Sequence, residues 1–148
     1  VSLMLMDDLF TSGKVADSMY ILAVGTMEYV HGDFTPDLGR IIQEGQWVCE
    51  QALWMKWTHC GKLIARKTCE VFVVNASLFR TVVLAHDQSL DFVIHYANCF
   101  VEYIADESHV GWMTDIWTDV KEHEELVRCA YGGVFEADLT RHKHTSFF

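Results

Sequence analysis

Hydrophobic residues in the first part of the chain recur at a spacing typical of helices. Over residues 3–10, apolar side chains stand four positions apart, which predicts a short helix that the polar stretch 11–13 ends. Over about 14–24, apolar residues again share one face of a helical projection. The sequence therefore predicts two short helices before residue 25.

A helix start signal stands at Thr35 and Pro36. Thr35 can cap the first turn, and the fixed φ of Pro36 suits the first helical position. A long apolar stripe at helical spacing follows, and Trp47 and Trp54 widen it. This pattern predicts one continuous helix over 35–57.

After residue 61 the pattern changes to short runs that are rich in β-branched and aromatic residues. Strands are expected at 69–74, 78–86, 91–103 and 109–117. The link 75–77 has the length of a hairpin turn, and short links imply antiparallel pairing. A short helix is expected over 120–129. Helices first and strands second predict one α+β domain over residues 1–148, with N-terminal helices packed on a curved antiparallel sheet that forms a cone-shaped pocket.

The composition of the chain limits which binding partners and which cellular compartment are expected. The formal net charge of −10 argues against nucleic acid as a partner, because an acidic surface repels phosphate backbones. No apolar run is long enough to cross a bilayer, so no membrane partner is expected. The five cysteines are an odd number without a C-x-x-C pair, which argues against a zinc site or a disulfide framework and favours free thiols in a reducing compartment. No glycine-rich phosphate loop and no H-E-x-x-H motif occurs, so no cofactor and no metal are expected.

Three stretches carry short motifs in a fixed order. They are residues 6–13 followed by Met27-Glu28-Tyr29, then Thr58-His59 followed by 79–86, and finally 95–98 through 106–112. In order and spacing they resemble the nuclear transport factor 2-like superfamily, and within it the SnoaL-like and scytalone dehydratase branch. The resemblance covers nearly the whole chain and implies a cone of helices closed by a curved sheet.

The resemblance also implies roles for four residues. Tyr29 would orient a water molecule in the cavity, and Asn98 would bind the substrate through its amide. His59 and His86 would form a histidine pair. The tyrosine–aspartate pair that the branch carries at its first helix break is missing here, which leaves open whether the chain is an enzyme.

The residues themselves suit acid-base chemistry in an apolar pocket. His86 ends an apolar run, and a neutral imidazole there could accept a proton near neutral pH, unless it simply faces water. Strand alternation would place Tyr96 and Asn98 on the same face. Trp54 and Tyr96 are aromatic candidates for contact with an apolar substrate, with a place in the core as the alternative.

A second resemblance is to limonene-epoxide hydrolase. Residues 29–40 are similar to its helix-entry segment, and Arg80 and Asp115 match two members of its Asp-Arg-Asp triad, while the third falls on Val82. Arg80 among apolar neighbours needs a counter-charge, for which Asp115 is the candidate. Burial in an apolar strand would raise the pKa of Asp115, as an acid-base carboxylate requires.

These features predict a cofactor-independent lyase or isomerase, of dehydratase or cyclase type, that acts on a small cyclic and largely apolar substrate. His86 would be the main acid or base, with His59 orienting a water or sharing the proton. The alternatives are a non-catalytic ligand-binding or assembly module of the same fold, and an epoxide hydrolase that uses Asp115 and Arg80. A cytoplasmic homo-oligomer, dimer or trimer, is expected.

Overall fold

A computed structural model describes residues 1–32, 39–106, 113–116 and 120–145 of the chain. The chain divides into two compact units: unit 1 holds Val1–Arg80 with Trp112–Trp117, and unit 2 holds Thr81–Gly111 with Thr118–Phe148. The chain therefore leaves unit 1 after residue 80, returns to it at 112 and leaves again after 117. The expectation of a single domain over residues 1–148 stays a prediction.

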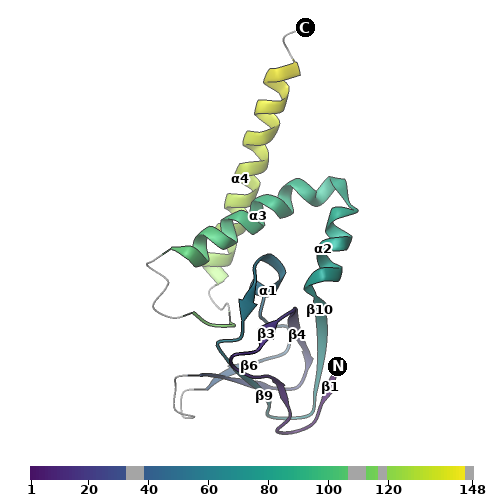
Figure 1. Ribbon diagram of the computed structural model, residues 1–148, viewed down its shortest axis with the longest axis vertical. Helices are drawn as coiled ribbons and strands as arrows, with labels where there is room; N and C mark the ends of the chain where they lie inside the picture. Colours follow the sequence, from purple (N-terminus) through teal and green to yellow (C-terminus); the bar gives the residue numbers. More distant parts are fainter. Residues whose placement is uncertain (33–38, 107–112, 117–119, 146–148) are drawn as a thin grey trace. The chain divides into compact units, whose positions relative to one another are not determined.

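Unit 1 is built mainly from antiparallel strands (Figure 1). In the part of the chain that the structure describes, these are β1 (Ser2–Leu3), β2 (Asp8–Phe10), β3 (Val15–Ala16), β4 (Ser18–Val24), β5 (Met27–His31), β6 (Arg40–Ile42), β7 (Trp47–Val48), β8 (Trp57–Thr58), β9 (Gly61–Ala65) and β10 (Cys69–Asn75). One sheet has the order β1-β10-β4-β7, another has the order β2-β9-β5-β6, and β3 pairs with β8. A short helix, α1 (Gln51–Trp54), lies between β7 and β8 in the sequence.

Alternating burial shows why these segments form strands. On β10, Cys69 and Val71 are buried while Glu70 and Phe72 are exposed, as the two-residue period of a strand requires. Val71 pairs with Leu22 of β4, so the buried faces of the two strands coincide. Thirteen buried residues of unit 1 form a core cluster: Leu3, Phe10, Leu22, Met27, Tyr29, Ile42, Val48, Cys49, Leu63, Ala65, Cys69, Val71 and Ile116.

The two helices expected before residue 25 are wrong, because β1 to β4 occupy this part of the chain. A spacing of four residues fits both periods, since it is about one helical turn and also two repeats of a strand. Leu3 and Phe10 are buried in the sheets, whereas Leu5 is 61 % exposed. The apolar residues over 3–10 therefore do not form one helical face.

The long helix expected over 35–57 is also wrong, because β6, β7 and the single turn of α1 lie within it. Between β6 and β7 the chain reverses direction, and the backbone N–H of Gln46 donates to the carbonyl of Gln43 at 3.1 Å. Gly45 has a φ of +83° in this turn, a left-handed conformation that glycine tolerates and a helix excludes. The cap signal at residues 35–36 lies outside the described residues.

Beyond residue 68 the sequence prediction succeeds only in part. The strand at 69–74 is confirmed as β10, whereas the strands at 78–86 and 91–103 are wrong, because these residues lie in α2 (Ala76–Leu84) and α3 (Asp87–Ala105). The side-chain oxygen of Asn75 accepts hydrogen bonds from the backbone N–H groups of Ser77 and Leu78, at 3.0 and 3.1 Å. Asn75 thus caps α2 and does not form a hairpin turn.

The aromatic residues of α3 repeat the ambiguity of the four-residue spacing. Phe92, Tyr96 and Phe100 share a face in a strand and equally in a helix, and their rings follow one another along α3 with centroids 6.2 Å apart. Most of the strand expected at 109–117 lies outside the described residues, and 113–116 is not a strand. The helix expected at 120–129 is confirmed within α4 (Val120–Thr145).

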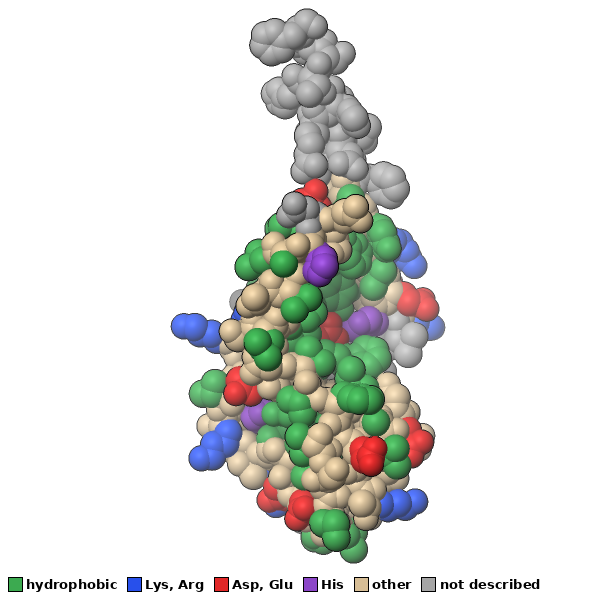
Figure 2. All heavy atoms as spheres, turned by 90° about the vertical axis from the view of Figure 1, so that its right-hand side faces the viewer, with side chains coloured by type: hydrophobic (Ala, Val, Ile, Leu, Met, Phe, Trp, Pro, Cys, Tyr) green, Lys and Arg blue, Asp and Glu red, His purple; other side chains and the backbone are tan. Residues whose placement is uncertain are grey.

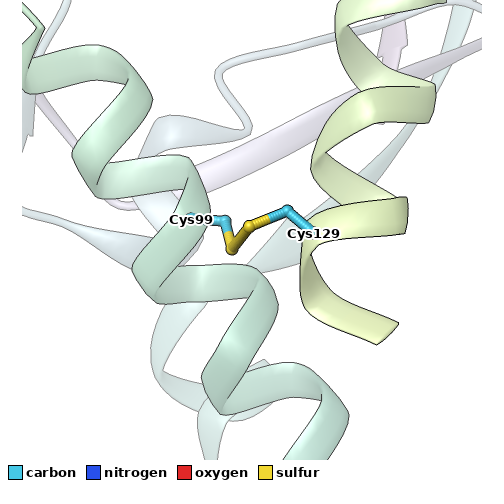
Figure 3. Close-up of a disulfide and its surroundings, with 2 residues drawn as sticks. All are labelled: Cys99 and Cys129. Atoms are coloured by element: carbon cyan, nitrogen blue, oxygen red, sulfur yellow. A yellow bond between two sulfur atoms is a disulfide. The ribbon is translucent and has the colours of Figure 1, made fainter. Parts of the chain in front are cut away.

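In unit 2, a disulfide between Cys99 on α3 and Cys129 on α4 links the two helices (Figure 3). It corrects the expectation that the cysteines are all free; Cys49, Cys60 and Cys69 are free. The pair is separated by 30 residues and has no sequence motif, and only the packing of the helices brings the two Cα atoms to 6.6 Å.

The expected α+β class, with N-terminal helices on a cone-shaped sheet, is therefore wrong. Antiparallel strands dominate unit 1, and the longer helices follow these strands in the sequence. Among the described residues, no helix is both long and apolar enough to cross a membrane. Over the strands of unit 1, in the lower part of the view, Figure 2 shows Lys and Arg side chains that stand apart from one another.

Candidate functional site

The segment 113–116 returns to unit 1 and is anchored there through its backbone. The carbonyl of Thr114 accepts a hydrogen bond from the side-chain amide of Gln51 at 2.8 Å. The carbonyl of Asp115 accepts one from the backbone N–H of Cys49 at 2.7 Å. Ile116 packs into the core cluster of unit 1. These contacts fix the position from which the Asp115 side chain enters the interior.

The Asp115 carboxylate is fully buried and accepts hydrogen bonds from five N–H and O–H donors and, at 3.7 Å, from the thiol of Cys49. Its Oδ2 accepts from the Tyr29 hydroxyl at 2.8 Å and from the backbone N–H groups of Cys60 and Gly61 at 2.8 and 2.9 Å. Its Oδ1 accepts from the indole N–H of Trp57 at 2.7 Å and faces Nδ1 of His59 at 3.3 Å. We call these five donors the cradle: Tyr29 Oη, Trp57 Nε1, His59 Nδ1, Cys60 N and Gly61 N. None of them belongs to a lysine or an arginine.

Two neighbouring strands place the donors of the cradle. Tyr29 lies on β5, and the other four donors lie on β8, on the start of β9 and on the link between them. β5 and β9 pair so that His31 lies opposite Gly61, which brings the ring of Tyr29 over this link. A Cβ atom at Gly61 would stand 2.5 Å from Cζ of Tyr29, so the absence of a side chain at Gly61 allows the phenol to reach the carboxylate.

The cradle keeps Asp115 ionised. Burial alone would raise its pKa, but hydrogen bonds from His59, Trp57, Tyr29 and Gly61 outweigh burial and hold the pKa below its ordinary value. This corrects the expectation that burial raises the pKa of Asp115 to that of a general acid. A carboxylate with this many donors is a poor proton donor at neutral pH and a good fixed anion.

The negative charge of Asp115 keeps its neighbours protonated. Burial and then the Asp115 charge raise the pKa of Tyr29 and that of the Cys49 thiol, and they raise the pKa of Cys60 to about 11. The phenol therefore remains a hydrogen-bond donor, and the two thiols are not activated as nucleophiles by this environment.

His59 meets two partners through the same ring nitrogen. Its Nδ1 lies 3.3 Å from Sγ of Cys49 and 3.3 Å from Oδ1 of Asp115, and its ring stacks on Phe10 with centroids 3.9 Å apart. A cysteine–histidine–aspartate nucleophile needs its partners on opposite ring nitrogens, so that the base can take a proton from the thiol while the carboxylate holds the other side. The arrangement here does not provide that relay.

A cavity of about 730 Å³ also lies on unit 1, and Trp57 of the cradle is one of its lining residues. Its wall includes Trp54, Lys56, Thr58, Ser77 and Arg80. The guanidinium of Arg80 donates to the carbonyl of Leu53 at 3.1 Å, and the Trp54 indole donates to the buried Glu50 at 3.2 Å. The cavity therefore has an aromatic wall, with Arg80 and Lys56 on it.

The structure brings together some of the residues that the sequence singled out and separates others. Tyr29, His59 and Asp115 meet in the cradle, and Trp54 and Arg80 line the cavity of unit 1. The proposed pairing of Arg80 with Asp115 is wrong, because the described donors to Asp115 are those of the cradle and the thiol of Cys49, and the Arg80 guanidinium donates to the backbone carbonyl of Leu53.

The remaining candidates belong to unit 2. His86 is exposed between α2 and α3, and Asn98 is exposed on α3. Tyr96 is buried, and its hydroxyl lies 3.1 Å from Nε2 of His123. These three residues lie in unit 2 and Tyr29 lies in unit 1, and the roles of the three as site residues stay predictions.

Sequence reasoning missed two kinds of donor. Trp57 was seen only as the end of a helix, and the N–H groups of Cys60 and Gly61 leave no trace in residue type. A glycine after Thr58-His59-Cys60, two positions before an apolar run, was the one available signal of close backbone approach.

Comparison with solved structures places the fold. The chain is similar to a cyclic nucleotide-binding-like protein from Brucella abortus bv. 1 str. 9-941, with a TM-score of 0.50 and 27 % identity over 56 % of this chain and 72 % of that chain. The fold resembles that of cyclic nucleotide-binding-like proteins. It is also similar to the N-terminal domain of a transcriptional regulator from Streptomyces coelicolor A3(2), with a TM-score of 0.58 and 15 % identity over 72 % of this chain and 78 % of that one.

A third similar structure is the EAL enzyme Bd1971 in its half-site-occupied form, with a TM-score of 0.51 and 20 % identity over 64 % of this chain and 86 % of that one. No protein-family model matches the chain, and no curated protein matches it. The resemblance to the nuclear transport factor 2-like superfamily, with its SnoaL-like, scytalone dehydratase and epoxide hydrolase branches, is therefore wrong. The lyase or isomerase function that was expected from this resemblance is therefore also wrong.

Proposed function

We propose that the chain is a regulatory module that binds an anionic small molecule of the cyclic nucleotide class, and that Asp115 occupies the anion site as an internal ligand. The observation that carries this proposal is the cradle, in which five donors converge on one buried carboxylate. The likeness of the fold to a cyclic nucleotide-binding-like protein supports the class of ligand.

The cradle has the chemistry of a phosphate site. Two successive backbone N–H groups, of Cys60 and Gly61, point at the same oxygen, and backbone nests of this kind bind phosphate as well as carboxylate. The hydroxyl of Tyr29 and the indole N–H of Trp57 add neutral donors. A cyclic phosphodiester carries a single negative charge, as a carboxylate does, so the exchange of one for the other leaves the charge of the site unchanged.

Binding of an external anion would require Asp115 to leave. A ligand whose site is open only part of the time binds with an affinity reduced by the open fraction, so the internal carboxylate sets a threshold for the ligand. The segment 113–116 is joined by the chain to α3 on one side and to α4 on the other. Its release from unit 1 would therefore be passed directly to unit 2, which gives the binding event a regulatory output.

Substitutions that remove the Asp115 carboxylate from the cradle test the proposal. Wild type, Asp115→Ala and Asp115→Asn would be titrated with 3′,5′-cyclic AMP and cyclic GMP by calorimetry, in chelator-treated protein, with inorganic phosphate as a second probe. Asp115→Ala should bind a cyclic nucleotide at least about ten-fold more tightly than wild type, because no internal anion has to be displaced. Glu70→Gln removes an exposed carboxylate on β10 and should leave the affinity unchanged.

A further substitution links binding to the cradle. In the Asp115→Ala background, Trp57→Phe should weaken binding, because it removes the indole donor and keeps most of the ring. Failure of both Asp115 variants to bind either nucleotide at millimolar concentration, with native circular dichroism, would contradict the proposal. So would binding that Trp57→Phe leaves unchanged.

The location, the oligomeric state and the enzymatic activity of the chain are open to experiment. We keep a cytoplasmic location and a homo-oligomeric state, for which sedimentation and cell fractionation are the tests. The expectation that the chain is an enzyme also stays a prediction, and the ligand-binding role does not depend on it.

A further inference from the structure

We infer that Cys49, His59 and Asp115 form a binding site for one divalent transition-metal ion of the zinc class. The three ligand atoms lie within 4.8 Å of one another, and all three residues are buried. Cys49 follows β7, His59 lies in the link between β8 and β9, and Asp115 comes from the returning segment 113–116. The inference goes beyond the proposed anion-binding role and assigns a second chemistry to the same interior.

The distances between the ligand atoms match those around a tetrahedral ion. A zinc ion with bonds of about 2.3 Å to sulfur and about 2.0–2.1 Å to nitrogen and oxygen separates its ligand atoms by about 3.3–3.6 Å. Here Sγ of Cys49 lies 3.3 Å from Nδ1 of His59 and 3.7 Å from Oδ1 of Asp115, and the latter two atoms are 3.3 Å apart. An ion fits at the centre of this triangle with ligand shifts of a few tenths of an ångström.

Charge balance favours a divalent ion in this buried place. Binding would release the thiol proton of Cys49 to solvent and move the hydrogen of His59 from Nδ1 to Nε2, while Asp115 is already a carboxylate. One thiolate and one carboxylate then neutralise the two positive charges, so that the buried site has no net charge. Among the described residues, Cys49, His59 and Asp115 supply three ligand atoms, and water or a small molecule would complete the tetrahedron.

Outer contacts hold each ligand in place before any ion arrives. The second carboxylate oxygen of Asp115 is held by Tyr29, Cys60 and Gly61, which leaves Oδ1 turned toward the other two ligands. The ring of His59 is clamped by stacking on Phe10. Such outer contacts orient metal ligands and raise affinity.

The backbone conformation of Cys49 favours glycine, which indicates that a cysteine stands at this position because its side chain is needed. Cys49 has a φ of +62°, in the left-handed region where a side chain is disfavoured and glycine is not. Its N–H donates to the carbonyl of Asp115 at 2.7 Å, so the strained residue is tied to the segment that carries the third ligand. A thiol is held here at a backbone position that is unfavourable for it.

This inference departs from the expectation of no metal. The sequence offered no ligand motif because His59 is 10 residues from Cys49 and 56 residues from Asp115. Only the return of the chain to unit 1 after residue 111 brings the third ligand to the other two.

Cobalt spectroscopy of the intact chain tests the site. Chelator-treated protein would be titrated with Co²⁺ under anaerobic conditions, followed by displacement with Zn²⁺ and competition with a chromophoric chelator. We expect one equivalent of Co²⁺, a near-ultraviolet thiolate-to-metal charge-transfer band and visible bands of a tetrahedral ion. Cys49→Ser, His59→Gln and Asp115→Asn should each weaken Zn²⁺ binding by roughly 100-fold or more, since loss of even an outer contact costs about 10–100-fold.

The matched control is Cys69→Ser, which removes another buried free thiol of unit 1, whose sulfur faces the carbonyl oxygens of Lys67 and Thr26 and not the proposed ion. It should leave the cobalt spectrum unchanged. A measurement on wild type alone makes the test independent of variant folding. Zn²⁺ should protect Cys49 from alkylation in mildly denaturing urea, as mapped by mass spectrometry, while Cys60 remains reactive.

Two results would overturn the inference. One is binding without a thiolate band, or binding that Cys49→Ser leaves intact, which would assign the ion to the histidines near the C-terminus. The other is equal alkylation of Cys49 with and without Zn²⁺. The nucleotide titrations use chelated protein, so failure of the metal site and failure of the anion site are observed separately.

Discussion

Removing the hydroxyl of Tyr29 should destabilise unit 1 far more than an ordinary tyrosine-to-phenylalanine change. This hydroxyl donates to Oδ2 of Asp115 at 2.8 Å and accepts from the backbone N–H of Asp115 at 3.2 Å. A hydrogen bond to a charged group contributes about 1.5–3 kcal/mol, and the N–H left without a partner adds about 1 kcal/mol. Tyr29→Phe should therefore lower the free energy of unfolding by about 2–4 kcal/mol.

Urea unfolding followed by tryptophan fluorescence measures this loss directly. All five tryptophans fall within the residue ranges of unit 1, so the signal reports the unit that contains Tyr29. Tyr20→Phe is the matched control, because Tyr20 lies on β4 of unit 1, stacks on Phe10 and is not among the described donors to Asp115. Its loss should stay below about 1 kcal/mol. If Tyr29→Phe costs no more than Tyr20→Phe, the cradle does not anchor the returning segment.

Three further predictions follow from individual contacts. The pKa of Asp115 lies below its ordinary value of 3.8, so its stabilising contribution is complete above about pH 4 and is lost as the pH falls through the lowered pKa. In chelated protein, the difference in urea midpoint between wild type and Asp115→Asn should therefore shrink on acidification below pH 4, and a constant difference would contradict the assignment. Gly61→Ala would place a Cβ atom 2.5 Å from Cζ of Tyr29 and should lower stability by about 1–3 kcal/mol in the same fluorescence assay. Reduction of the Cys99–Cys129 disulfide should destabilise the helices of unit 2 by about 2–4 kcal/mol, measured by circular dichroism at 222 nm with Cys99→Ser as the comparison, and no change would mean that the bridge constrains little.

The sequence predicted helices and strands correctly where the spacing of apolar residues fitted only one of the two. The run 69–74 is short and rich in β-branched and aromatic residues and is β10, and the charged helix that follows residue 120 is α4. The prediction of helices and strands failed where apolar residues were four positions apart, because that spacing fits both kinds of element. Residues 3–10 contain the end of β1 and the whole of β2, whereas Phe92, Tyr96 and Phe100 lie on α3.

The site could be predicted only through its side chains. Asp115 stood out as an acid among apolar neighbours, and Tyr29 and His59 were candidates for polar contacts within a pocket. The partners of Asp115 could not be inferred from the sequence, because two of them are backbone N–H groups. The sequence also carries no sign that residues 113–116 return to unit 1. The sign of the Asp115 pKa shift was missed for the same reason, since burial was visible in the pattern and the hydrogen bonds were not.

Nuclear magnetic resonance of the two backbone donors tests the central claim most directly. In ¹⁵N-labelled Asp115→Ala, the amide signals of Cys60 and Gly61 would be followed while 3′,5′-cyclic AMP is added. If the cradle is an anion site that Asp115 occupies in the wild type, both amide protons should move downfield on binding, toward their wild-type positions. Saturable binding that leaves both signals unmoved, or no binding at all, would contradict the claim that a cyclic nucleotide takes the place of the Asp115 carboxylate.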